Sequence, residues 1–369
     1  MEKIFIQGNE AVGEAALAAG CHAFFGYPIT PQNETFEWFA QKFPKMGRTF
    51  VQAQSEVGAI NMVYGAAATG KRVITSTSGP GWGLMQEGIA NLCAGELPCV
   101  IALVQRGGTP GAPSVQHAQA DYLSATRGGG GSGYRNIVLA PASVQETYDL
   151  VQLAFYLADK YRNPVILLSD ALIGHLMEPL ELRTLNFDSL PEKEWAVRGK
   201  GKQNDKKRRY VTFAAVVQGR EPYPTMMSFA KHWYDKVEKM KSEVRAEMTQ
   251  QDDCKLWIVA YGYTSRVSKE AVNEACAQGL GVGFIRPITL WPFPEKAISE
   301  AIEKGAKKFL VVEDNIEGQM VEDVNAAVQG KADVHHLGLF ARHLPTPAGM
   351  ILPHRISEEI NRLLQKGDK

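Results

Sequence analysis

The sequence predicts an α/β protein with a doubly wound parallel sheet and a second, smaller α/β unit. Short β-rich runs alternate with helical stretches along most of the chain, and the run at residues 99–104 is apolar almost without interruption. The alternation is typical of a parallel sheet with helices on both faces. The apolar run is typical of a central strand that is buried on both sides.

The expected elements of the first unit follow one another closely. Proline or glycine residues separate several of them, since both residues interrupt regular structure. Ser143 is expected to cap the helix that follows it. We expect strands at residues 2–7, 21–25, 49–53, 72–75, 99–104, 136–140 and 164–169, helices at 11–19, 33–42, 57–69, 84–94 and 144–161, and a glycine-rich turn at 76–83.

The α/β pattern stops near residue 184 and resumes near residue 256. We therefore expect three parts: residues 1–184, a connection at 185–252 that contains a long charged helix at 226–248, and a second α/β domain at 253–369. In the last part we expect strands at 256–260, 282–285 and 308–312, helices at 265–277, 295–304, 318–328 and 357–364, and a proline-rich turn at 290–294. The basic run at residues 200–209 is interpreted as a solvated loop, with a docking patch for an acidic partner as the alternative.

Composition excludes several function classes. Forty basic residues balance forty acidic ones in the 369-residue chain, which gives no support for binding to nucleic acid or to a membrane surface. No apolar run approaches the roughly 18 residues of a membrane span, and the N-terminus lacks the pattern of a signal peptide, so a cytoplasmic location is expected.

The five cysteines form no C-x-x-C pair, so the sequence spells out no metal site in this chain. Cys21, Cys93 and Cys99 lie in apolar stretches and are expected to be buried, reduced thiols. Any redox centre that serves this protein is therefore expected on another chain.

Two stretches near the N-terminus are candidates for a site. Residues 26–31 (GYPITP) end one expected strand, and residues 54–58 (QSEVG) lie between another strand and a helix. Ligands of open α/β sheets bind at the carboxyl ends of the strands, where both stretches would lie. We predict that Glu56 is a buried acid that acts on a cofactor and that Thr30 lies close to the substrate. Arg106 follows the apolar strand, and the five N–H donors of its guanidinium are suited to binding a carboxylate.

Each of these residues also has a purely structural interpretation. Glu56 could be an acid favoured by the dipole of a first helical turn, Arg106 could form an ordinary salt bridge, and Thr30 could be a turn hydroxyl. No P-loop motif occurs, and residues 128–133 match G-x-G-x-x-G without the strand and helix that a nucleotide site requires.

In combination, three stretches resemble the α subunit of 2-oxoacid:ferredoxin oxidoreductases. They are residues 26–32, residues 54–67 and residues 305–313 after the 290–294 turn, and their order and spacing cover nearly the whole chain. The likeness is greatest to the branched-chain (2-oxoisovalerate) type, on the evidence of residues 85–89, 106–108, 119–122 with 125–126, and 159–164. The resemblance implies a pyrimidine-binding domain of thiamine-diphosphate enzymes and a second domain like the C-terminal domain of transketolase.

The resemblance also implies an activity and roles for individual residues. A branched-chain 2-oxoacid would be decarboxylated on thiamine diphosphate, electrons would pass to ferredoxin, and the acyl group would pass to coenzyme A. Glu56 is implied to bond the pyrimidine ring of the cofactor, next to Tyr27, Pro28 and Ile29, while Thr30 and Arg106 would contact the oxoacid.

The family's Gly-Asp-Gly motif for diphosphate and Mg²⁺, with its downstream Asn-Asn, is not found in this chain. The resemblance therefore implies a β subunit that holds the diphosphate, Mg²⁺ and iron–sulfur clusters, together with a γ-type subunit and a small ferredoxin-like subunit. A non-catalytic scaffold subunit with the same fold is the alternative.

The side chain of the substrate is predicted from the loop after Arg106. Relatives that act on 2-oxoglutarate carry a basic residue in this loop, whereas residues 111–118 contain His117 but no lysine or arginine. A branched apolar side chain needs no second cation, so a branched-chain oxoacid is preferred over 2-oxoglutarate. An aromatic 2-oxoacid is a further alternative.

Overall fold

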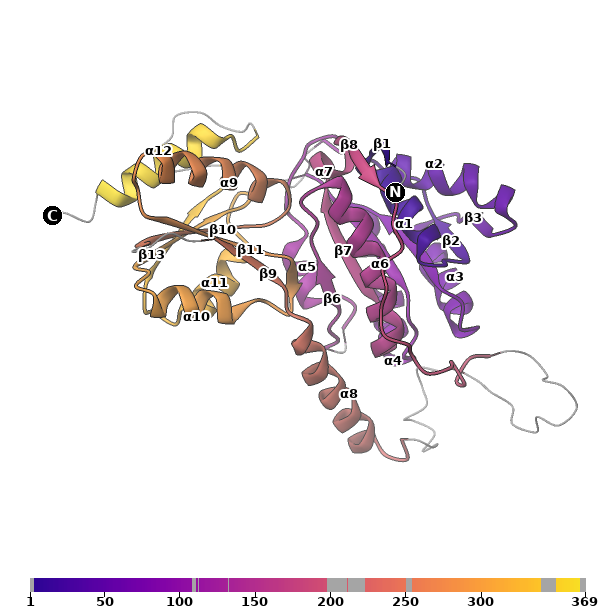
Figure 1. The fold of residues 1–369 in the computed structure, drawn as a ribbon. Coiled ribbons are helices and arrows are strands. Elements are labelled where there is room, and N and C mark those ends of the chain that lie inside the picture. The colour runs from indigo at the N-terminus through magenta and orange to yellow at the C-terminus, as the bar shows by residue number, and fades with distance from the viewer. Residues whose placement is uncertain are drawn as a thin grey trace, which may run out of the picture.

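The computed structural model describes residues 3–107, 111, 113–131, 133–197, 211, 223–249, 254–339 and 350–365. In this part of the chain, an N-terminal and a C-terminal α/β unit lie side by side, and the long helix α8 (Met226–Met240) extends away from the C-terminal unit (Figure 1). The basic run at residues 200–209 lies outside the described residues.

The N-terminal unit is built on a sheet whose strand order is β12-β6-β7-β5-β4-β2-β3. All neighbouring strands are parallel except β12, which pairs antiparallel with β6 at the edge. The bounds are β2 (Ala23–Gly26), β3 (Thr49–Gln52), β4 (Val73–Thr77), β5 (Val100–Gln105), β6 (Ile137–Leu139), β7 (Val165–Asp170) and β12 (Thr289–Trp291).

Helices cover both faces of this sheet. Ile101 and Leu103 of β5 share one buried cluster with Ile89 of α4, whereas Val100 and Ala102 belong to another, because side chains alternate along a strand. The sheet is therefore doubly wound, as predicted. Its helices are α1 (Gly8–Ala18), α2 (Asn33–Lys42), α3 (Glu56–Ala68), α4 (Gly79–Ala94), α5 (Tyr122–Arg127), α6 (Val144–Tyr161) and α7 (Ala171–His175), with a 3₁₀ turn η1 (Pro44–Met46).

The C-terminal unit has a smaller sheet of order β14-β13-β10-β11-β9, in which β9 alone among the described strands runs antiparallel to its neighbour. Its strands are β9 (Ala246–Thr249), β10 (Leu256–Ala260), β11 (Val282–Pro287), β13 (Lys308–Val312) and β14 (Asp333–Leu337). Its helices are α9 (Gly262–Ala277), α10 (Glu295–Glu303), α11 (Met320–Val328) and α12 (Pro353–Gln365), and η3 (Lys241–Glu243) follows α8.

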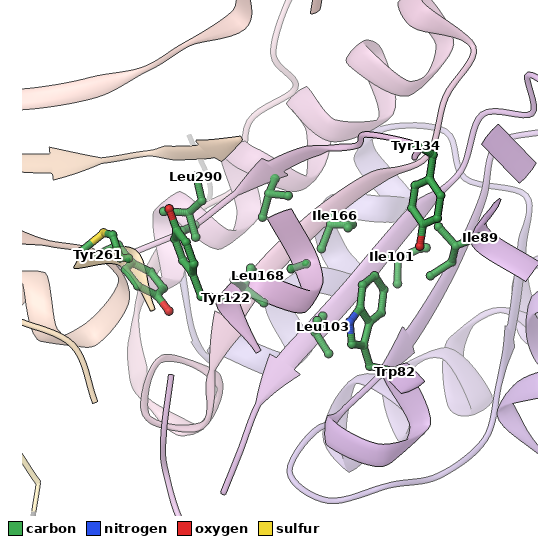
Figure 2. Close-up of a cluster of buried hydrophobic side chains, with 14 of the residues drawn as sticks. Trp82, Ile89, Ile101, Leu103, Tyr122, Tyr134, Ile166, Leu168, Tyr261 and Leu290 are labelled. Atoms are coloured by element: carbon green, nitrogen blue, oxygen red, sulfur yellow. The ribbon is translucent and has the colours of Figure 1, made fainter. Parts of the chain in front are cut away.

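The two units share part of one hydrophobic core. The cluster around β5 continues through Tyr122 of α5 to Tyr261, which follows β10, and the two ring centroids are 5.7 Å apart. Figure 2 shows these rings beside Leu290, with Trp82 and Leu103 further along the same layer. The C-terminal unit is therefore packed onto the N-terminal one through apolar side chains.

Several expected elements differ from the observed ones. Helix α4 begins at Gly79, inside the expected glycine-rich turn, because Pro80 fits the first turn of a helix where no N–H is needed. The helix expected at 226–248 ends at Met240, and residues 246–249 instead form β9, since pairing with β11 outweighs local helix propensity. The strand expected at 2–7 is β1 (Lys3–Gln7), which pairs antiparallel with β8 (Met177–Glu181) outside the main sheet.

The division of the chain at residues 184 and 252 stays a proposal. Strand β9 lies in the connecting part but pairs in the C-terminal sheet, and β12 lies in the C-terminal part but extends the N-terminal sheet. The expected turn at residues 290–294 begins within β12, and Pro292 follows the end of that edge strand.

An ionic cluster attaches helix α8 to the N-terminal unit. The Glu96 carboxylate, just after α4, lies 3.0 Å from Lys236 Nζ, 2.7 Å from His232 Nε2 and 3.7 Å from Arg162 Nη1. Burial acts to raise the pKa of Glu96, but Lys236, Arg162 and His232 together outweigh it and lower the pKa to about 2. The cluster therefore stabilises the docking of α8 most strongly when Glu96 is ionised.

We expect Glu96→Gln to reduce the free energy of unfolding by about 3 kcal/mol, because Lys236 is then buried without its carboxylate. A folded-state pKa near 2, below the ordinary value of 4.5, means that this contribution is present above about pH 4.5 and is lost as the pH falls through 2. Urea unfolding at several pH values measures it. The surface pair Glu238–Lys241 is the control, since Glu238→Gln should cost less than about 1 kcal/mol.

Candidate active site

The candidate site lies at one edge of the N-terminal sheet. Strands β3, β2, β4 and β5 are neighbours and run parallel, so the segments that follow them meet at the same edge. These segments carry the predicted residues: Thr30 after β2, Glu56 after β3 and Arg106 after β5. The segment after β4 begins helix α4 between them.

Glu56 is a buried acid, as expected, and is the first residue of α3. The residue is 4% exposed, and Ser55 caps the helix by accepting a hydrogen bond from the Gly58 amide at 3.3 Å. The dipole of the helix favours a carboxylate at this end. Within the described residues, the Glu56 carboxylate forms no hydrogen bond and no ion pair, so its oxygens remain available to another molecule.

Gly81 of α4 makes room for this carboxylate. A Cβ atom added at Gly81 would lie 2.4 Å from Glu56 Oε1 and 2.4 Å from Thr77 Oγ1, far closer than atoms can approach. Glycine is therefore required for α4 to begin this close to Glu56. Gly81 could not be singled out from the sequence, because its role depends on a contact between two segments 25 positions apart.

Unpaired hydroxyls lie along the carboxyl-terminal half of β4 and just after it. The side-chain oxygens of Thr75, Thr77 and Ser78 are buried and have no hydrogen-bond partner in the described part of the chain. Buried polar atoms are normally paired, so such a group at the carboxyl edge of a sheet indicates a place where another molecule supplies the missing partners.

Thr30 and Arg106 lie together. Arg106 Nη1 donates a hydrogen bond of 2.6 Å to the Thr30 carbonyl oxygen, while Asn33 Nδ2 donates to Thr30 Oγ1 at 3.5 Å. The Arg106 side chain passes over Gly79, where a Cβ atom would lie 2.8 Å from Nε. Arg106 forms no ion pair in the described residues, so the ordinary salt bridge considered as its alternative role is not observed.

The segment before Thr30 lies at the surface of the same edge. Tyr27 is 37% exposed, Pro28 is exposed and Ile29 is half-buried. The buried Gln32 holds the segment, because its Nε2 donates to the Tyr27 carbonyl oxygen at 3.3 Å and its Oε1 accepts from the Ser76 hydroxyl. Gln32 is a further residue of the site that the sequence did not single out.

The C-terminal unit approaches the site through the carboxyl ends of its own strands. Gln119 Nε2 donates to the Tyr261 carbonyl oxygen at 2.8 Å, and its Oε1 accepts from Thr264 Oγ1 and from the Asp314 amide, each at 3.0 Å. Asp170, at the end of β7, accepts from the Tyr263 amide at 2.9 Å. The segment around Gln119 is therefore clamped between the two sheets.

His117 is engaged in this clamp. Its Nδ1 lies 2.6 Å from Asp314 Oδ2, and the bond to Asp314 raises the pKa of His117. The His117 side chain, in the loop that follows Arg106, is thereby paired with a buried acid of the C-terminal unit.

The comparisons with known proteins agree with this architecture. Residues 14–246 match the family described as "Pyruvate flavodoxin/ferredoxin oxidoreductase, thiamine diP-bdg", and residues 254–347 match "Pyruvate:ferredoxin oxidoreductase core domain II". The chain is 47% identical, over 87% of its length and 89% of the relative's, to ketoisovalerate oxidoreductase subunit VorB of Methanothermobacter marburgensis. It is 35% identical, over 98% and 99%, to 2-oxoglutarate synthase subunit KorA of the same organism.

Solved structures show the same fold. The 2-oxoglutarate:ferredoxin oxidoreductase from Magnetococcus marinus, solved with 2-oxoglutarate, coenzyme A and succinyl-CoA bound, aligns with a TM-score of 0.83 at 27% identity over 98% of this chain and 65% of that one. A split-gene transketolase aligns with a TM-score of 0.60 at 16% identity, which supports the fold alone. The chain belongs to the family of 2-oxoacid:ferredoxin oxidoreductase subunits.

Two further expectations concern membranes and thiols. In the described residues, no helix is long and apolar enough to cross a membrane. Cys21, Cys93 and Cys99 are free and buried, as expected, and burial raises the pKa of Cys21 and Cys93 to about 12.

Gly81→Ala should displace the Glu56 carboxylate and lower oxoacid-dependent dye reduction by the assembled complex about 100-fold, the usual effect of moving a reacting group by about 1 Å. Gly83→Ala is the matched control on the same helix, because its Cβ would enter open space, and it should retain full activity. Equal activity of the two variants would show that the contact between Gly81 and Glu56 is unimportant.

Proposed function

We propose that this chain is the subunit that activates thiamine diphosphate in a coenzyme A-acylating oxidoreductase specific for a branched-chain 2-oxoacid. The observation that carries the proposal is Glu56: a buried carboxylate at a helix start, unpaired in the described residues, at the carboxyl edge of a sheet whose family binds thiamine diphosphate.

Glu56 fits the aminopyrimidine half of the cofactor. Thiamine diphosphate supplies the electron sink that decarboxylates a 2-oxoacid, and the protein supplies position and proton transfer. Glu56 would bond a ring nitrogen and share a proton with it. The dry surroundings strengthen such a bond, and Gly81 keeps the space beside the carboxylate open. Tyr27, Pro28 and Ile29 would border the ring at the open side of the edge.

Arg106 and Thr30 would receive the oxoacid. One nitrogen of Arg106 is already occupied by the Thr30 carbonyl oxygen, which fixes the direction of the guanidinium. Its remaining donors can form a fork for the substrate carboxylate. Because Arg106 lies beside Gly79 and Glu56 lies beside Gly81, the oxoacid would lie over the start of α4, facing the cofactor ring.

A branched-chain substrate is supported by the loop that follows Arg106. Residues 107–118 contain neither lysine nor arginine, and His117 is paired with the buried Asp314. A second carboxylate, as in 2-oxoglutarate, would lack a free cation in this loop. The higher identity to the ketoisovalerate subunit than to the 2-oxoglutarate subunit points the same way.

Partner subunits would complete the enzyme. Helix α3 is apolar on nearly all sides, and its outward residues Val57 and Met62 are 46% and 39% exposed. A helix that is apolar all round is normally covered. We propose that a β subunit covers it beside Glu56 and brings the diphosphate and Mg²⁺ site and iron–sulfur clusters, while a γ-type and a ferredoxin-like subunit complete the path to coenzyme A and ferredoxin.

Glu56→Gln in the assembled complex should lower acyl-CoA formation and ferredoxin reduction at least about 100-fold, because an amide cannot take part in the proton transfer. The near-identical shape should leave subunit assembly intact, which size-exclusion chromatography checks. Wild-type rates in this variant would rule out the proposed role of Glu56.

Oxoacid turnover by the wild-type complex tests the substrate class. We expect kcat/KM for 2-oxoisovalerate to exceed that for 2-oxoglutarate, pyruvate and phenylpyruvate by about tenfold or more, since one misplaced or unpaired group costs roughly that factor. A preference for 2-oxoglutarate would contradict the argument from the loop after Arg106.

A further inference from the structure

A cavity that the proposed function does not use is lined by residues from both units. Its volume is about 660 Å³. Pockets that hold small organic ligands measure about 300–1,000 Å³, so this cavity has the size of such a site. Its lining comes from the end of α5 and the segment before β6 in the N-terminal unit, and from the end of β12, α10 and α11 further along the chain.

This cavity lies at the opposite edge of the N-terminal sheet from Glu56. Arg135 lies just before β6, at the amino end of that strand, and β6 runs parallel to β7 and β5. Trp291 ends β12, which runs antiparallel to β6, so the chain leaves β12 at the edge where it enters β6. A strand of six residues, such as β5, spans about 20 Å. The cavity is therefore separate from the candidate active site.

Positive charge dominates the lining of the cavity. Its charged residues are the four cations Arg127, Arg135, Lys241 and Lys296 and the two acids Glu295 and Asp323. Lys241 is paired with Glu238 at 2.6 Å. Asp323 already accepts from Arg127 Nη2 and from the Tyr122 hydroxyl, each at 2.6 Å. The acids of the cavity therefore do not neutralise all of its cations.

Arg135 and Lys296 form no ion pair in the described residues. Arg135 is held by its backbone surroundings, because its Nη1 donates to the carbonyl oxygens of Arg127 at 2.9 Å and of Tyr134 at 3.4 Å. Its other donors have no partner within the described ranges. Burial lowers the pKa of Arg135, and the charge of Arg127 lowers it further. An anion placed beside both guanidinium groups would relieve this repulsion.

The glycine-rich run at residues 128–133 ends beside this cavity, but the amides of Gly129 and Gly130 are already used. They donate to the Tyr134 hydroxyl at 3.3 Å and 3.4 Å, and that hydroxyl donates to Gln86 Oε1 at 2.7 Å. A Cβ atom at Gly130 would lie 2.1 Å from the Gln86 carbonyl oxygen, so glycine allows the run to pack against α4. The arginines that flank the run, rather than these amides, are available to an anion.

An aromatic surface borders the same cavity. Trp291 and Phe293 line it and are half-buried, next to the buried Pro292 and Pro294. Trp291 packs against two buried hydrophobic clusters, and Phe293 packs against one of them. Both rings are therefore held in place while part of each borders the cavity. Flat heterocyclic rings stack on aromatic side chains of this kind.

We propose that this cavity binds a nucleoside phosphate. Its phosphate groups would lie between Arg127, Arg135 and Lys296. Its base would stack on Trp291 or Phe293. A phosphate requires cations that are not already neutralised, and a base requires a flat apolar surface, and the cavity provides both. A simple inorganic anion would leave the aromatic surface unused. Because the lining comes from both units, the bound nucleotide would also join them.

Calorimetric titration of the assembled complex with ADP tests the proposal. Saturating coenzyme A is present and oxoacid is absent, so that any surface that binds coenzyme A is already occupied. ADP should bind, and pyrophosphate and adenosine should each bind at least about tenfold more weakly, because each lacks one half of the contacts. Absence of ADP binding overturns the proposal. Pyrophosphate that binds as tightly as ADP overturns the assignment to a nucleoside phosphate.

Two variants assign the binding to this cavity. Arg135→Gln and Lys296→Glu should each weaken ADP binding about tenfold or more, because each removes a cation from the phosphate groups. Lys296 is exposed, so its variant changes the charge without disturbing the packing that Arg135 supports. Arg183→Gln is the matched control, since Arg183 lies outside the cavity and is paired with Asp149, and it should change the affinity less than twofold. ADP affinity that is unchanged in Lys296→Glu, or weakened equally in Arg183→Gln, overturns the proposal.

Discussion

The close approach of helix α4 to the Glu56 carboxylate is the constraint on which the rest of the site depends. Glu56 is buried at the start of α3, and α4 begins directly against it because Gly81 has no side chain. Burying an unpaired carboxylate costs free energy, which the dipole of α3 offsets only in part. The Glu56 carboxylate is thus left without a hydrogen-bond partner in the described residues, and we propose that the ring of a bound cofactor supplies one.

The same contact explains why the other site residues lie where they do. Arg106 lies beside Gly79, and Glu56 lies beside Gly81. At both positions the absence of a Cβ atom leaves room for the neighbouring side chain at the start of α4. Arg106 reaches Thr30 on the far side of β4, so one cation joins two segments of the edge. Glu56 and Arg106, the side chains that we propose for cofactor and substrate binding, therefore both lie against the start of α4.

The C-terminal unit contributes to this edge without providing the predicted site residues. The carboxyl ends of its strands face those of the N-terminal sheet, and Gln119 bonds Tyr261 and Asp314 across the boundary. The segment that follows Arg106 is therefore clamped by the second unit. The shared core around Tyr122 and Tyr261 makes this arrangement stiff.

The sequence by itself determined the strand–helix order, the doubly wound sheet and the placement of Thr30, Glu56 and Arg106 at strand ends, because these follow from local apolar patterns and from chain direction. It did not predict that β9 and β12 pair across the expected boundaries, since edge pairing depends on which sheet lies nearby and not on local propensity. The tertiary structure alone decided the roles of Gly81 and Gln119. Each acts through contacts with residues distant in sequence or on another segment, and such contacts leave no periodic signal in the chain.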